Sequence, residues 1–146
     1  MADLTITPGN VLKDASILPG NEDKSRVSGE VVDAGEIYYL NTASNSVATL
    51  AENGGTELQA TAYAMAVNSS EVAGQTIDGV TEGLVTIGTH GLAIGTPLFV
   101  SANPGKIAPL ADLTLGTSKA KLVGTIANTT QLYVSLKAPP PYPVDP

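Results

Sequence analysis

The chain has 146 residues, no cysteine, and fourteen acidic against seven basic side chains, which gives a net charge of −7. A chain of this length can bury one core without disulfide or metal staples, and the lack of cysteine excludes thiol catalysis and thiolate metal ligation. The negative charge disfavours nucleic acid as a partner, because phosphate would be repelled.

The first six residues, Met1-Ala2-Asp3-Leu4-Thr5-Ile6, contain neither the basic start nor the apolar stretch of a signal peptide. We therefore expect synthesis in the cytoplasm. No run approaches the roughly 18 apolar residues that a membrane-spanning helix needs, so the sequence predicts no membrane partner.

Residues 1–26 are predicted to form an extended N-terminal arm. Two Pro-Gly-Asn turns interrupt this stretch, at 8–10 and 19–21, and it shows little periodicity. The mixed-charge run 21–26 that ends it is typical of a solvated hinge. The apolar side chains of such an arm are candidates for contacting a partner: Leu4, Ile6, Val11, Leu12, Ile17 and Leu18.

A β domain is predicted over 27–137, because short β-type runs are separated there by Gly, Asn, Ser or Pro clusters at the spacing of a sandwich or barrel. The clearest run is 131–137, in which Leu132 and Val134 alternate with Tyr133 and Ser135, as in a half-buried strand. The predicted strands are 27–32, 36–41, 46–51, 58–67, 75–80, 83–88, 97–101, 106–110, 121–127 and 131–137.

The stretch 57–67 allows two interpretations. Its alanines favour a helix by propensity, but its alternation of small and large side chains also fits a strand. We prefer the strand, because the segment aligns with 117–127 in the internal repeat described next.

The sequence contains an internal repeat: the pattern of apolar, polar and turn residues in 34–70 recurs in 94–130, at a constant offset of sixty residues. Gly35 aligns with Gly95, and each is expected to open a hairpin at a positive φ angle. Two equivalent halves that close on each other would remove exposed sheet edges. The sequence thus predicts an all-β fold, a small barrel or sandwich built from two pseudo-repeated halves.

The C-terminal segment 138–146, Ala-Pro-Pro-Pro-Tyr-Pro-Val-Asp-Pro, cannot join a sheet, since proline has no amide proton to donate. It is predicted to be a polyproline II tail. Two interpretations stay open: a stiff solvated tail, or a tail that docks in an aromatic-lined groove on a neighbour through Tyr142 and Val144.

The sequence offers little for catalysis. His90 is the only histidine and lies at an expected turn, and no Gly-x-Ser-x-Gly elbow accompanies it. The carboxylates are scattered, apart from Glu30, Asp33 and Glu36, which could bind an ion weakly. Six aromatic residues without tryptophan argue against a glycoside hydrolase. We expect no enzymatic activity, no cofactor and no metal.

Several short sequence motifs, in their order along the chain, resemble motifs of the phage capsid decoration proteins, also called cement proteins. The hairpin strand Val-Asp-Ala-Gly-Glu-Ile-Tyr-Tyr-Leu at 32–40 is similar to a motif of that family, as is 64–75. The strand pair formed by 95–101 and 105–107, and the closing strand 122–127, continue the resemblance, which covers about 30–137.

This resemblance implies a β-barrel or β-tulip-like sandwich on the outer face of a phage head, present as homotrimers that bind the major capsid protein through a terminal arm. It supplies no catalytic residues. The protein would be a structural component of the virion. The alternative is another virion or surface β-module, such as a tail-tube or fibre component or a glycan-binding unit.

Overall fold

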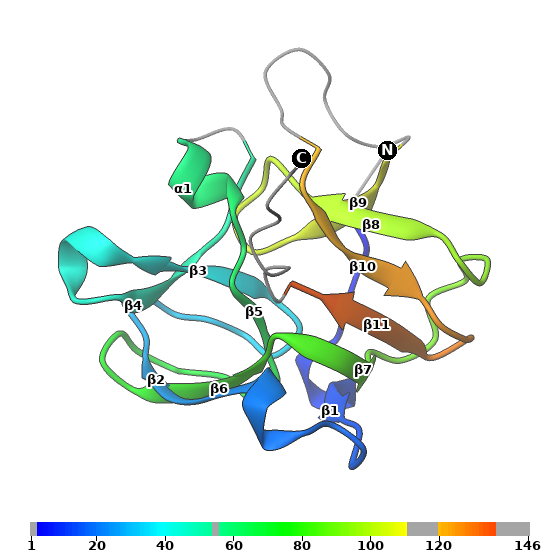
Figure 1. Cartoon of the computed structure of the whole chain (residues 1–146), viewed down its shortest axis with the longest axis horizontal. Helices are drawn as coiled ribbons and strands as arrows, with labels where there is room; N and C mark the ends of the chain where they lie inside the picture. Colours follow the sequence, from blue (N-terminus) through cyan, green and yellow to red (C-terminus); the bar gives the residue numbers. More distant parts are fainter. Residues whose placement is uncertain (1–2, 54–55, 111–119, 137–146) are drawn as a thin grey trace, which may run out of the picture.

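The computed structural model describes residues 3–53, 56–110 and 120–136 (Figure 1). Eleven strands in these ranges form two antiparallel sheets, which lie on opposite sides of the molecule in Figure 1. Sheet A has the order β1-β7-β11-β10-β8-β9 and sheet B the order β2-β6-β5-β3-β4. The all-β prediction is confirmed as a sandwich, whereas the closed barrel that we offered beside it is wrong.

The elements are short, and their bounds follow in chain order: η1 (Pro8–Asn10), β1 (Leu12–Lys13), η2 (Pro19–Asn21), β2 (Glu22–Val27), β3 (Ile37–Asn41), η3 (Thr42–Ser44), β4 (Val47–Leu50), α1 (Glu57–Ala60), β5 (Ala64–Ala66), β6 (Thr76–Val80), β7 (Glu82–Thr86), β8 (Pro97–Val100), β9 (Ile107–Pro109), β10 (Leu122–Ile126) and β11 (Gln131–Ser135).

The main core lies between the two sheets. The alternation predicted for β11 is present, since Leu132 and Val134 are fully buried while Tyr133 is exposed. Sheet B contributes Ile37 and Met65 to the same cluster. Burying such aliphatic side chains provides the main free energy of folding, at about 1.5–3 kcal/mol for each large one.

A second, smaller core covers the other face of sheet B. The fully buried Tyr38, Ala64 and Ile77 belong to this cluster. Sheet B curls so far that its edge strands β2 and β4 touch, and a bridge joins Ser28 to Ala48. Both faces of sheet B are therefore buried.

The prediction of one strand over 58–67 is wrong. Glu57–Ala60 form the short helix α1, and only Ala64–Ala66 form a strand, β5. A capping box starts the helix: the Thr56 hydroxyl accepts a hydrogen bond from the Gln59 amide, and the Gln59 side chain accepts one from the Thr56 amide. These reciprocal bonds satisfy backbone groups that a strand would have paired elsewhere.

The prediction of an extended N-terminal arm over 1–26 is also wrong, because strands within 3–27 pair with strands of the β domain. Leu12–Lys13 pair with β7, and the Leu4 amide donates to the Ile107 carbonyl at 2.9 Å. The run 21–26 was predicted as a hinge, but 22–27 form the edge strand β2, which pairs with β6. Of the strand predicted over 27–32, only Val27 lies in a strand, as the last residue of β2. The charges of β2 are tolerated because they pair with one another.

The two sheets share a four-strand order, β4-β3-β5-β6 in one and β9-β8-β10-β11 in the other. Ile37 pairs with Met65, and Pro97 pairs with Thr125, sixty residues later on both strands. Gly35 and Gly95 both have positive φ, 93° and 88°. The hairpins nevertheless differ in register by one residue, so the repeat itself stays a prediction.

Glu22 links the N-terminal segment to sheet B. Its carboxylate lies 2.7 Å from the Lys13 ammonium on β1 and 3.2 Å from Lys24. The hydrogen bond from Lys13, helped by Lys24, lowers the pKa of Glu22 below its ordinary value.

A depressed carboxyl pKa stabilises the folded state fully above the unfolded pKa of about 4.3, and this stabilisation disappears as pH falls through the lower folded value. We therefore expect Glu22→Gln to lower the melting temperature at pH 7, and the difference from the parent protein to vanish towards pH 2. Thermal unfolding across this range measures it. A difference that does not change with pH would contradict the ion-pair explanation.

Candidate interaction surface

Sheet A presents one face away from the main core. On β11, Tyr133 points outward, and it pairs with Leu84 of β7 on one side and Thr125 of β10 on the other. One row further, Leu122 pairs with Phe99. The apolar residues at these outward positions form what we call the open face: Leu12, Leu84, Pro97, Phe99, Leu122 and Tyr133.

The open face combines exposed apolar side chains with very little charge. Leu12, Leu122 and Tyr133 are 65%, 46% and 39% exposed. Among the described strands of sheet A, Glu82 is the one charged residue at a paired position on the outward face. Its carboxylate accepts a hydrogen bond of 3.1 Å from the Tyr133 hydroxyl. Burial, with this bond, raises the pKa of Tyr133, so the phenol stays neutral. A grouped apolar surface of this kind is typical of an interaction site.

The structure separates the residues predicted to contact a partner into three groups. Leu12 and Leu18 are exposed, and Leu12 belongs to the open face. Val11 and Ile17 are buried in the main core, and Leu4 and Ile6 pack against it. Tyr142 and Val144 lie outside the described residues.

Five of the six open-face residues were not among the predicted contact residues: Leu84, Pro97, Phe99, Leu122 and Tyr133. The alternation of β11 placed Tyr133 on the polar side of its strand, which was a usable signal. The other four are ordinary apolar strand residues, and only the register of sheet A shows that they face outward beside Tyr133.

A groove of about 320 Å³ continues the open face beyond β7. Ile17 and Gly83 both line it, and Ile17 packs so closely on Gly83 that a Cβ atom at Gly83 would overlap the Ile17 side chain. Leu18, which is 66% exposed, and Tyr133 also line the groove. We call this the Leu18 groove; its lining is Ser16, Ile17, Leu18, Asn21, Glu82, Gly83, Leu84 and Tyr133.

Comparison of the chain with protein-family models, curated proteins and solved structures found no match. The likeness to capsid decoration proteins therefore depends on the sequence motifs alone, and the function must be argued from the surfaces of this molecule.

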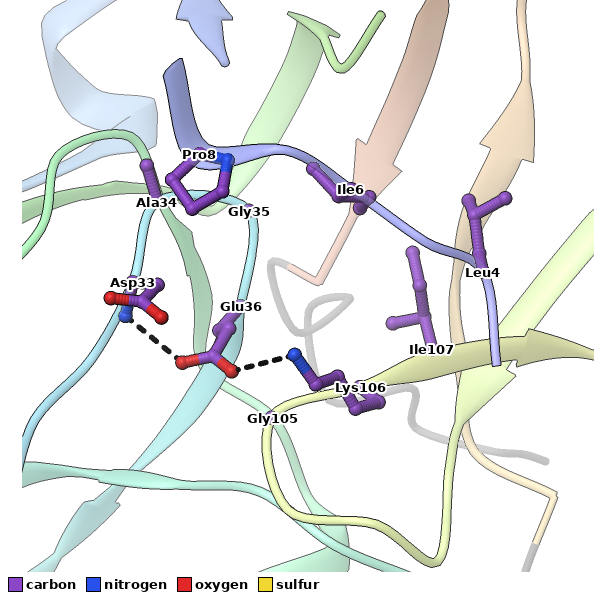
Figure 2. Close-up of a pocket in the computed structure, with 10 residues that line it drawn as sticks. All are labelled: Leu4, Ile6, Pro8, Asp33, Ala34, Gly35, Glu36, Gly105, Lys106 and Ile107. Atoms are coloured by element: carbon purple, nitrogen blue, oxygen red, sulfur yellow. Dashed lines mark hydrogen bonds and ion pairs between the residues drawn. The ribbon is translucent and has the colours of Figure 1, made fainter. Parts of the chain in front are cut away.

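A second hollow, of about 170 Å³, lies under the N-terminal segment (Figure 2). Two of its charged side chains pair with each other: the Lys106 ammonium lies 3.0 Å from the Glu36 carboxylate, whose other oxygen accepts a hydrogen bond from the Asp33 backbone amide. Leu4 and Ile107 supply an apolar wall. The ion pair connects the turn at 33–36 to the hairpin at 105–107. We therefore interpret this hollow as part of the packing between these two segments and not as a binding site.

His90 is held by backbone on both ring nitrogens. The Leu92 amide donates to Nδ1 at 3.0 Å, so Nε2 carries the proton and donates to the Asn128 carbonyl at 2.7 Å. In the described ranges, no three His, Asp or Glu side chains gather as they would around a metal ion. The described helices are all too short to cross a bilayer.

Proposed function

We propose that this protein is a non-catalytic structural component of a phage virion that binds the outer surface of the major capsid lattice through the open face of sheet A. The observation that carries the proposal is the contrast between the sheets. Sheet B is buried on both faces, whereas sheet A exposes an apolar face around Leu122 and Tyr133.

The motifs shared with decoration proteins support the same surface. The stretch 95–101 contains β8 with Phe99, and 122–127 contains β10 with Leu122. Two of the four motifs that resemble the family, 95–101 and 122–127, thus contribute residues to the open face, whereas 32–40 and 64–75 lie in sheet B.

Binding to a lattice makes weak contacts sufficient. Each copy that binds only the assembled shell stabilises it by mass action, and homotrimers would hold several capsid subunits at once, which raises the effective affinity. The net charge of −7 would keep the protein from adhering to DNA.

The test is binding to undecorated mature heads, measured as stoichiometric co-sedimentation and as added heat resistance of the heads. Leu122→Asp should weaken binding by roughly tenfold or more, because a carboxylate buried in an apolar interface loses its hydration. Val72→Asp is the matched control: Val72 is 57% exposed and lies beside Ser28, which flanks sheet B, so this variant should bind normally.

Undiminished binding of Leu122→Asp would refute the open face as the docking surface. Heads that bind no parent protein would refute the capsid function itself.

A glycan-binding unit is the second candidate, and the exposed ring of Tyr133 is the observation that favours it, since sugars stack on aromatic rings. Glycan binding that disappears in Tyr133→Ala, with no binding to phage heads, would establish this alternative.

A further inference from the structure

The Leu18 groove is lined by apolar and aromatic side chains of the kind that bind proline-rich peptides. We infer that it binds the C-terminal segment 138–146 of a second copy of this chain. The inference concerns self-association of the free protein and does not depend on capsid binding.

The groove and the segment are complementary in chemistry. The segment has five prolines among nine residues, with Tyr142 and Val144 as further apolar groups and Asp145 as its one charged side chain. Such segments adopt the extended polyproline II form before binding, so little conformational entropy is lost when they dock between apolar and aromatic side chains. The groove presents Leu18 and Tyr133 for this purpose.

The position at which the C-terminal segment follows strand β11 favours binding in the groove of a second copy over binding in the groove of its own chain. The Leu136 amide still bonds the Thr81 carbonyl, so the described chain ends only three residues beyond Tyr133 of the groove. Strand β11 runs from Tyr133 past Ser135 to Leu136, so a segment that continues in this direction moves away from Tyr133 and would have to turn back to contact that ring in its own chain. A residue that precedes proline is restricted to extended conformations, which applies to Ala138, Pro139 and Pro140.

The segment also has the reach that a neighbour requires. At a polyproline II rise of about 3.1 Å per residue, residues 138–146 span roughly 25 Å. Each copy carries both a groove and a segment, so the contact is of the head-to-tail type that closes into rings when the rotation between copies allows it. A trimer of this protein would be one such ring.

The first experiment measures self-association of the full-length chain by sedimentation velocity over a concentration series. Tyr133→Ala should weaken association by roughly tenfold or more, as truncation of a central aromatic anchor does. Tyr63→Ala is the matched control, because Tyr63 is equally exposed at 39% but lies under Arg26, outside the groove. An excess of the free peptide 138–146 should reverse the association of the parent protein.

A chain that stays monomeric, or equal effects of the two tyrosine variants, would overturn the inference. Circular dichroism checks that both variants are folded. Because no capsid is present, this failure is separate from that of the proposed function: Leu122→Asp could still abolish binding to heads while Tyr133→Ala leaves self-association unchanged.

The second experiment identifies which chain donates the segment, and it uses the absence of native cysteine. Mixing Ser16→Cys protein with Val144→Cys protein should give a disulfide-linked heterodimer, since Ser16 lines the groove. Pairing Val72→Cys with Val144→Cys should give none. If the double variant Ser16→Cys/Val144→Cys forms only an internal disulfide and the mixture forms no heterodimer, the groove takes its own chain's segment and the inference is wrong.

Discussion

Replacing Gly124 with alanine is expected to lower the free energy of unfolding by about 3 kcal/mol or more. Gly124 lies in β10 opposite Val134 of β11, and an added Cβ would overlap the backbone carbonyl of Tyr133. Backbone on a paired strand cannot move aside as a flexible side chain could, so the two strands must separate locally. Chemical denaturation measures the change. Because β10 and β11 carry Leu122 and Tyr133, the candidate surface should be disturbed together with the fold.

Gly20→Ala is the control for this prediction. An added Cβ at Gly20 has no atom within 4 Å. Its stability should stay within about 0.5 kcal/mol of the parent, as for most surface substitutions. Equal stabilities of the two variants would show that β10 and β11 are not packed as the structure has them.

The second large loss of stability is expected for Asp23→Ala, at about 3 kcal/mol. Asp23 is 6% exposed and accepts three hydrogen bonds, two from the Arg26 guanidinium at 2.9 and 3.0 Å and one from the Tyr38 hydroxyl at 2.8 Å. Without the carboxylate, a partly buried cation and a buried hydroxyl are left unpaired. In the parent protein, burial and the Asp23 charge raise the pKa of Tyr38 far above its ordinary value, so the neutral hydroxyl donates to Asp23.

Tyr38→Phe separates the ion pair from the hydroxyl. It removes one hydrogen bond and leaves Asp23 paired with Arg26, so the expected loss is about 1 kcal/mol. Denaturant titration of both variants at pH 7 ranks the two contributions. An Asp23→Ala variant no less stable than Tyr38→Phe would mean that the Arg26 pair adds nothing to stability.

Local hydrogen-bonding chemistry decided the main errors of the sequence analysis. At 57–67 the alternation suggested a strand, yet the reciprocal bonds of Thr56 and Gln59 stabilise a helical turn first. At 22–26 the charges suggested a solvated hinge, but Asp23 is buried because Arg26 and Tyr38 supply its partners. A pattern of polarity does not reveal that Asp23 will be buried with Arg26 of its own strand and Tyr38 of β3 as its partners.

The sequence by itself determined the all-β class, the position of most strands and the inward and outward sides of β11, because alternation with period two and turn residues act over a few positions. Only the tertiary structure decided that the N-terminal segment belongs to the domain, that Val11 and Ile17 are buried while Leu12 and Leu18 are exposed, and that sheet A keeps an open face. The physical reason is that exposure depends on which strands become neighbours and which sheet face is covered, and both are settled by contacts between residues far apart in the chain.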